Sequence, residues 1–339
     1  LSDGWNYSFD GESKTVSLPY AFSNPDMKTY NISYTFDDNL PDNTNDLYVV
    51  GYYSNFDLYI DGELYYQCDK GSRRTPGTEY VIVGMPDELS GKTITIEYKP
   101  HLDVGKFRIV APYIGNKGDI IRGLFIENLF DALLLLISTA MGAALVVVAI
   151  FIRFNMRHIN VNVLSTGLFA LFSGAYMLAR IEWIRVFFDV DHILYLIEFN
   201  SLMVLMLPIL ILLLSVFTGG SKVIVKVLLY INILNVLVEE SLSLLNILTL
   251  REMLPVNHAV LIVTTAAFLY CLYVRREIIE EYKFETTVSI IPLVVFSALD
   301  VAIHYLRTDI RAGMLLKIGI IFFLCFQIFF IVKKYNTYN

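Results

Sequence analysis

The stretch LFDALLLLISTAMGAALVVVAIFI, residues 129–152, decides the fold class of this chain. It contains one charged residue, Asp131, and it is followed directly by the basic segment Arg153-Phe154-Asn155-Met156-Arg157. A helix of about 20 apolar residues crosses the hydrocarbon core of a bilayer, which is roughly 30 Å thick. The stretch therefore predicts a membrane-spanning helix.

Six further stretches downstream have the same character, so we expect seven spans, with six as the alternative count. Turn and charge signals such as Thr218-Gly219-Gly220-Ser221-Lys222 separate most of them. The fourth span is the weakest because Glu239-Glu240 interrupts it, and no span is conspicuously broken by glycine or proline. The expected spans lie at about 129–152, 161–183, 193–217, 223–248, 256–274, 286–306 and 312–332.

The composition indicates that one part of the chain lies in water and the other in a membrane. Hydrophobic residues make up 55% of the chain and charged residues 17%, and the mean hydropathy is +0.56; soluble proteins are about 45–50% apolar and about 25% charged. Residues 1–120 hold 18 acidic and 10 basic side chains (net −8), whereas residues 121–339 hold 15 and 16 (net +1). The overall charge of −7 argues against a nucleic-acid partner. We expect an acidic, water-facing domain followed by a membrane domain.

Lysines and arginines in the loops predict the orientation, because cytoplasmic loops carry an excess of them. One set of span ends is richer than the other, with Arg153, Arg157, Lys222, Lys226, Arg275, Arg276, Lys283, Lys333 and Lys334 against Arg185, Arg251, Arg307 and Arg311. We assign the richer set to the cytoplasm, which places the N-terminal domain outside and the C-terminus inside. Residues 1–5 do not resemble a signal peptide, so we expect that a leader once preceded them.

Residues 1–120 predict an antiparallel β-sandwich of the jelly-roll type. Apolar and polar side chains alternate at 30–36, and similar alternation is expected at 47–53 and 93–98. Asp61-Gly62 favours the type I′ turn of a hairpin. The expected division is a sensor sandwich at 1–120, a juxtamembrane linker at 121–128, a seven-helix membrane domain at 129–335 and the start of a truncated cytoplasmic segment at 336–339.

Aromatic side chains of the sandwich are candidates for stacking on a sugar, with packing in the core or at its rim as the favoured alternative. The candidate ligand-binding residues are Trp5, Tyr52, Tyr53, Tyr65 and Tyr66. The acidic loop at 37–39 and 42–46 has oxygen ligands of the kind that Ca²⁺ prefers. Because the loop lacks an EF-hand pattern, a solvated loop is favoured and no metal site is predicted.

The ionisable residues inside the expected spans include seven that the order of the spans places in the outer half of the bilayer: Arg180, Glu198, Glu239, Glu240, Asp300, His304 and Lys317. Such residues are unfavourable in lipid and usually face the interior of the bundle. One interpretation is a set of interhelical ion pairs, such as Lys317 with Asp300 or Arg180 with Glu198. The other is a polar cavity that couples the sandwich to the helices.

Motifs for catalysis are not found. The sequence has no nucleophile elbow, His-Glu-x-x-His, phosphate loop or Cys-x-x-Cys. We therefore expect no enzymatic activity, no cofactor and no metal in this chain. The three cysteines, Cys68, Cys271 and Cys325, are expected to be small buried hydrophobic residues.

The whole chain resembles the bacterial seven-transmembrane receptors with diverse intracellular signalling modules, whose external domains are galactose-binding-like jelly rolls. The resemblance rests on Gly4-Trp5, Val16-Ser17-Leu18-Pro19, Leu58-Tyr59-Ile60-Asp61-Gly62-Glu63-Leu64-Tyr65-Tyr66-Gln67, Gly91-Lys92-Thr93-Ile94-Thr95-Ile96 and Ile114-Gly115-Asn116-Lys117-Gly118-Asp119-Ile120-Ile121. It implies a multi-pass sensory receptor of a bacterial cytoplasmic membrane that binds an extracellular small molecule or glycan. It also implies a cytoplasmic output module in cis or in trans, of which a diguanylate cyclase (GGDEF) domain is the closest match.

Two other functions remain open at this point. A transporter or accessory subunit would use the sandwich to capture substrate, although no inverted repeat is visible. An intramembrane enzyme is disfavoured because no nucleophile and base can be paired. Membrane lipid is an expected partner, and a homodimer is compatible with a cyclase output, although no span has a clear Gly-x-x-x-Gly face.

Overall fold

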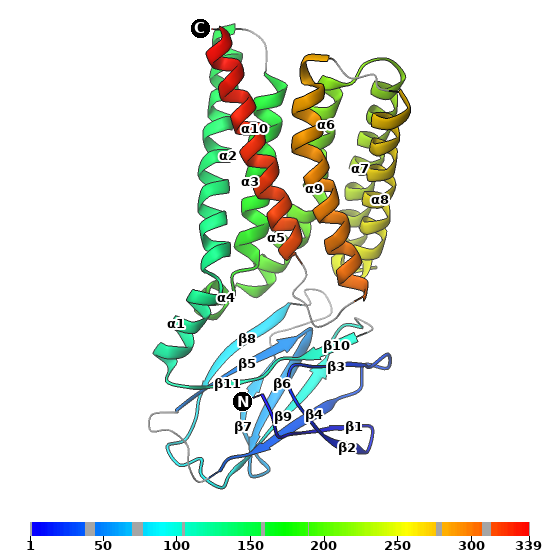
Figure 1. Cartoon of the computed structure of the whole chain (residues 1–339). Helices are drawn as coiled ribbons and strands as arrows, with labels where there is room; N and C mark the ends of the chain where they lie inside the picture. Colours follow the sequence, from blue (N-terminus) through cyan, green and yellow to red (C-terminus); the bar gives the residue numbers. More distant parts are fainter. Residues whose placement is uncertain are drawn as a thin grey trace. The chain divides into compact units, whose positions relative to one another are not determined.

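Figure 1 shows the computed structural model, with strands in the N-terminal third of the chain and helices in the remainder. The structure describes residues 2–37, 45–69, 77–103, 106–156, 160–188, 190–275, 280–306 and 313–338. The chain forms two compact units. The first consists of Leu1–Asp131 together with Arg180–Leu196, and the second of Ala132–Ala179 together with Ile197–Asn339.

The first unit is built on antiparallel strands, which confirms the β class of the N-terminal domain. Its strands are β1 (Trp5–Phe9), β2 (Glu12–Val16), β3 (Tyr20–Ser23), β4 (Tyr30–Thr35), β5 (Asp46–Tyr52), β6 (Ser54–Ile60), β7 (Glu63–Cys68), β8 (Thr78–Gly84), β9 (Thr93–Pro100), β10 (Lys106–Ile109) and β11 (Tyr113–Gly115). They form a six-stranded sheet in the order β2-β1-β4-β9-β6-β7, a three-stranded sheet β11-β5-β8 and the pair β10-β3.

The sheets enclose one apolar core, as in a β-sandwich. The six-stranded sheet contributes Trp5, Ile32 and Phe56, and the other strands contribute Leu47 and Phe107, all fully buried. Inward positions alternate with outward ones along β4 and β9, as expected at 30–36 and 93–98.

Two hairpins turn at Asp-Gly pairs. The expected turn at Asp61-Gly62 joins β6 to β7 with φ of 50° and 84°, the left-handed values that a type I′ turn requires. Asp10-Gly11 joins β1 to β2 in the same way, with φ of 52° and 83°. This second hairpin was not predicted from the sequence, although its Asp-Gly signal is the same.

Strand β5 departs from the expected alternation at 47–53 because both of its faces are buried. Leu47 and Val49 point into the sandwich core. Tyr48 and Val50 belong to a second apolar cluster on the opposite face. The uninterrupted apolar run Leu47-Tyr48-Val49-Val50 is typical of a strand covered on both sides.

The helices are α1 (Lys117–Glu127), α2 (Leu129–Met156), α3 (Val161–Ala179), α4 (Glu182–Phe188), α5 (Asp191–Val204), α6 (Met206–Val216), α7 (Gly219–Leu244), α8 (Leu250–Tyr270), a π-helical end at Cys271–Arg275, α9 (Glu280–Leu306) and α10 (Met314–Tyr338). Residues 121–127 of the linker expected at 121–128 lie in α1, and Asn128 is its C-terminal cap. Asn116 caps that helix by accepting a hydrogen bond from the Gly118 amide at 2.8 Å. Residues 336–338, placed in a separate segment by the sequence analysis, continue α10.

Six helical segments among the described residues are long and apolar enough to cross a membrane: Leu129–Asn155, Val161–Ala179, Asp191–Val216, Gly219–Leu244, Leu250–Tyr273 and Met314–Lys334. The chain is therefore a multi-pass membrane protein. The expected sixth span is the one that falls short, since its described apolar stretch is only Thr287–Ile303. Gly219–Leu244, which contains Glu239-Glu240, is long and apolar enough to cross a membrane, although the sequence made it the weakest of the expected spans.

The third span, Asp191–Val216, contains one turn residue, Leu205, between α5 and α6, three residues before Pro208. Leu205 itself keeps right-handed helical φ and ψ of −58° and −31°. A proline has no amide hydrogen to donate, and its ring clashes with the carbonyl one turn earlier. Pro208 therefore sits in the first turn of the second helix, where its missing donor is tolerated.

Small residues allow α2 and α3 to approach closely within the second unit. A Cβ added to Gly142 would lie 2.8 Å from backbone atoms of Gly167 and of Leu171. Such close backbone approach is common between membrane helices.

Two of the three cysteines expected to be buried, Cys68 and Cys271, are buried, but Cys325 is exposed.

Candidate coupling site

The outer face of the three-stranded sheet is covered by helices of the first unit. Tyr48 and Val50 of β5 pack with Ile120 and Leu124 of α1, and Trp183 of α4 packs against this cluster. The i, i+4 spacing of Ile120 and Leu124 places both on one face of α1. The sandwich is therefore packed against the helix that precedes the first span and against the helix that follows the second.

Tyr48 connects this sheet to the start of α4 by a buried hydrogen bond. Its hydroxyl donates to Glu182 Oε2 at 3.3 Å. Burial, followed by the nearby Glu182 charge, holds the pKa of Tyr48 well above its usual value, so the phenol stays a donor. The Glu182 amide in turn donates to Asn128 Oδ1, at 3.4 Å, and Asn128 separates α1 from α2.

Arg185, one turn further along α4, makes the second connection. Its guanidinium carbon lies 5.5 Å from the centroid of the Tyr80 ring on β8. Its Nη1 lies 3.6 Å from Asp191 Oδ1 at the start of α5. Both members of this ion pair are buried, at 6% and 8% exposure. Removing one partner of a buried pair leaves the other charge unfavourably placed, which makes such pairs sensitive to displacement.

The backbone before β8 also lies beside the start of α5. A Cβ on Gly77, directly before β8, would lie 3.6 Å from the Cβ of Asp191. The site thus joins β5 and β8 of the sandwich to α4 and to the start of α5. None of its members was predicted from the sequence; the signals were the all-apolar strand at 47–50 and the charged residues at 182, 185 and 191 between two spans.

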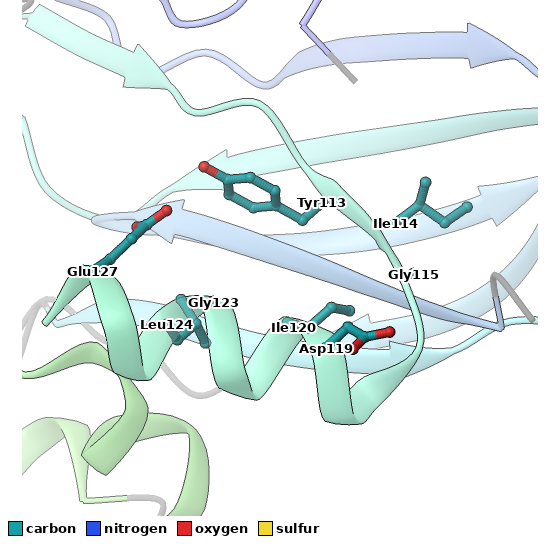
Figure 2. Close-up of a pocket in the computed structure, with 8 residues that line it drawn as sticks. All are labelled: Tyr113, Ile114, Gly115, Asp119, Ile120, Gly123, Leu124 and Glu127. Atoms are coloured by element: carbon teal, nitrogen blue, oxygen red, sulfur yellow. The ribbon is translucent and has the colours of Figure 1, made fainter. Parts of the chain in front are cut away.

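A shallow pocket of about 190 Å³ lies beside this site, between β11 and α1. Figure 2 shows Asp119 and Glu127 at opposite ends of the pocket and Tyr113 across from the helix. The pocket is smaller than the roughly 300–1,000 Å³ of most small-molecule sites. We therefore do not place the expected ligand there.

The expected ligand-binding aromatic residues are not gathered into one surface. Trp5 has 0% exposure in the sandwich core, so its ring offers nothing to a ligand. Tyr52 ends β5 and packs against the cluster of Tyr48 and Ile120, and Tyr53 lies in the turn before β6. Tyr65 and Tyr66 lie on β7. Tyr65 is exposed and donates to the carbonyl of Gly84 at 2.8 Å, whereas Tyr66 packs against the core. Most of the Ca²⁺ candidate loop lies outside the described residues.

The seven ionisable residues singled out in the expected spans are distributed over both units. Arg180 belongs to the first unit, whereas Glu198 belongs to the second. The side chain of His304 lies outside the described part of the chain. Lys317 is partly buried on α10.

Asp300 of α9 has a clear structural role. Its two carboxylate oxygens accept hydrogen bonds from the amides of Gly313, at 2.7 Å, and Leu315, at 3.2 Å. These amides lie at the start of α10, where backbone donors lack partners within the helix and the helix dipole favours a negative charge. Asp300 therefore fastens the N-terminus of α10 to α9.

Glu239 lies on a polar face between α7 and α8. Asn232 donates to Thr264 Oγ1 at 2.9 Å, and Asn235 lies 3.5 Å from Asn257 in a weaker contact. Glu239, seven residues after Asn232, continues this face with 2% exposure. The uncharged members of this face were missed because only ionisable residues were considered.

A second uncharged network joins four helices. Gln327 of α10 donates from Nε2 to Ser289 Oγ of α9 at 2.8 Å. Its Oε1 lies 3.5 Å from Thr166 Oγ1 of α3. Ser215 of α6 donates to Asn162 Oδ1 of α3 at 2.6 Å. The first two turns of α3 are therefore bonded to α6 and α10.

No protein-family model, curated protein or solved structure matches this chain. Within the described residues, no group of three or more histidine, cysteine, aspartate or glutamate side chains is placed to hold a metal ion.

Proposed function

We propose that the chain is a sensory receptor of a bacterial cytoplasmic membrane, with a jelly-roll sandwich outside, seven spans and its C-terminus inside. The sandwich binds an extracellular ligand, such as a carbohydrate or an envelope component. Binding shifts the helices between two arrangements, and α10 passes the change to a cytoplasmic output module, for which a diguanylate cyclase is our candidate. The ligand must have different affinities for the two arrangements.

One observation carries this proposal: the segment between the second and third spans belongs to the same compact unit as the sandwich. Its buried contacts with the sandwich run through Tyr48–Glu182 and Tyr80–Arg185. A ligand that displaces β5 or β8 would therefore displace α4. Since α4 follows α3 after two residues, the displacement would reach a membrane helix directly.

The contacts of α3 supply the next step toward α10. The Phe169 and Phe323 rings of these helices meet edge to face at 4.5 Å between centroids. Thr166 meets Gln327 one turn further along. We infer that α3 transmits the movement of α4 to α10. One end of α3 leads into the sandwich unit, and the other end is bonded to the helix that leads to the output module.

The experiment uses the full chain in nanodiscs, with spin labels on cysteines placed at the exposed positions Val223 of α7 and Val332 of α10. Cys325 is replaced by serine. Defined saccharides and cell-wall fragments are screened for binding by thermal shift. A ligand found in this way should change the distance distribution between the labels. A ligand that binds tightly and leaves the distribution unchanged would contradict the receptor proposal.

The coupling route has its own control. Arg185→Gln should abolish the distance change while the ligand still binds. Lys28→Gln, which removes an exposed ion pair with Asp10 in the same unit, should leave the change intact.

The alternative is a transporter whose sandwich captures substrate. The turn between α5 and α6 at Leu205 is the feature that favours it, because transporters commonly bind substrate where spans are interrupted; Leu205 itself keeps helical dihedral angles. Uptake of the labelled ligand into proteoliposomes, dependent on this chain, would support the alternative against the receptor.

A further inference from the structure

Aromatic side chains on α1 and α4 form a ridge on the surface of the first unit. The Phe125 and Trp183 rings lie 6.0 Å apart between centroids, and the Trp183 and Phe187 rings lie 6.4 Å apart. Phe125 is 48% exposed and Phe187 54% exposed. Ile126 and Phe188 extend the exposed apolar surface beside them. Contiguous apolar patches on water-facing domains commonly mark interaction sites.

The ridge lies close in sequence to three ends of candidate spans. Phe125 precedes Leu129, the start of the first span, by four residues, which is about 6 Å of helix. Trp183 follows Ala179, the end of the second span, by four residues, and Phe187 precedes Asp191, the start of the third, by four. The headgroup layer on each side of the hydrocarbon core is about 5–8 Å thick. The chain connections therefore keep the ridge within reach of this layer.

The residue types fit the boundary between headgroups and acyl chains. Aromatic rings are enriched at this boundary. Phe125 and Phe187 expose about half of their side chains, and Trp183 contributes its half-buried ring between them, with its Nε1 buried in the protein. Arg122, one turn before Phe125 on α1, is exposed and carries a charge that suits lipid phosphates. We propose that the aromatic ridge, defined as Phe125, Trp183 and Phe187, binds the lipid headgroup boundary of the membrane that the chain spans.

The position of the two tryptophans makes this proposal directly testable, because Trp5 and Trp183 are the only ones in the chain. Trp5→Phe leaves Trp183 of the ridge as the sole emitter. Trp183→Phe leaves Trp5, which has 0% exposure in the sandwich core, as the matched control. The full chain carrying either change is reconstituted into phosphatidylcholine vesicles that contain lipids brominated near the headgroup or near the chain ends.

We expect Trp183 to lose most of its emission with lipids brominated near the headgroup and less with lipids brominated near the chain ends. Trp5 should lose little with either lipid. If Trp5→Phe does not fold, the difference between the unsubstituted chain and Trp183→Phe gives the same information.

Two results would overturn the proposal. Quenching of Trp183 by aqueous iodide, without quenching by brominated lipid, would show that the ridge faces water. Protection from both quenchers would show that protein covers it, either a second copy of the chain or other helices of the same chain.

Discussion

Arg185 lies over the ring of Tyr80, with its guanidinium carbon 5.5 Å from the ring centroid, and this contact joins a helix between two membrane spans to a strand of the sandwich. Such cation–π contacts contribute about 0.5–1 kcal/mol when exposed and about 2 kcal/mol or more when desolvated. Arg185 is also paired with Asp191. The two contacts hold α4 against the sandwich and against the start of α5 within the first unit. If the proposed coupling is right, α4 should be among the first segments to respond to a movement of the sandwich.

The hydrogen bond between Tyr48 and Glu182 predicts a measurable coupling energy. Tyr48→Phe and Glu182→Gln should each destabilise the sandwich unit, and the double variant should lose about 1 kcal/mol less than the sum of the two. Thermal unfolding of the full chain, followed by Trp5 fluorescence in a Trp183→Phe background, measures this. Strictly additive losses would show that the two side chains do not interact.

His101 predicts a pH dependence for the sandwich. Burial lowers the pKa of His101 from 6.5 to about 4 against a smaller opposite effect of Asp69. Between pH ~6.5 and ~4 the imidazole is protonated in the unfolded chain but not in the folded chain. The free energy of unfolding is therefore highest above pH ~6.5 and decreases as the pH falls toward ~4. Unfolding midpoints at pH ~7 and ~5 should differ less in His101→Asn than in the unsubstituted chain. Equal differences in both chains would exclude His101 as the cause.

Asp300 predicts a loss of stability through the start of α10. Asp300→Ala removes both acceptors of the Gly313 and Leu315 amides and should destabilise the chain by about 1–2 kcal/mol. Asp300→Asn keeps one acceptor oxygen and should lose less. Thermal unfolding in detergent compares the two variants; equal stability of Asp300→Ala and the unsubstituted chain would contradict the capping role.

Replacing Gln327 should reduce the response to ligand more than it reduces the stability of the chain. Gln327→Leu removes the bonds of α10 to Ser289 and Thr166, at an expected loss of about 0.6 kcal/mol and no more than about 2. If α3 acts on α10 through these bonds, the ligand-induced distance change between α7 and α10 should shrink while affinity is retained. Phe329→Leu, a substitution of an exposed side chain on the same helix, is the control. An unchanged response in Gln327→Leu would remove this network from the coupling route.

The parts of the fold that follow from local patterns could be predicted. Apolar runs identify most of the spans, and Asp61-Gly62 identifies a hairpin because left-handed φ values favour those residues. The count of seven stays a prediction, since the sixth stretch has a short apolar core in the described helix. Helix α1 was expected as a linker because its cap at Asn116 stands in a polar stretch that also suits a loop.

The candidate site could not be predicted because its residues are distant in sequence. Tyr48 and Glu182 are 134 positions apart, and neither lies in a motif. Asp300, which lies inside an expected span, caps a helix, whereas Arg185, which lies between two expected spans, belongs to the candidate site. Hydrogen bonds between uncharged side chains, such as Asn232 with Thr264, leave no charge signal in the sequence.

The attachment of the sandwich to the start of α5 is tested most directly by a disulfide between positions 77 and 191. A Cβ at Gly77 would lie 3.6 Å from that of Asp191, within the range of about 3.5–4.5 Å found in disulfides. The three natural cysteines are first replaced, and the full chain with Gly77→Cys and Asp191→Cys is oxidised mildly in membranes. Gly77→Cys with Ile193→Cys, an exposed position on α5, is the control. We predict that the 77–191 pair loses its reactivity to maleimide and regains it on reduction, while the control pair stays reactive. Free thiols at both 77 and 191 after oxidation would contradict the coupling account.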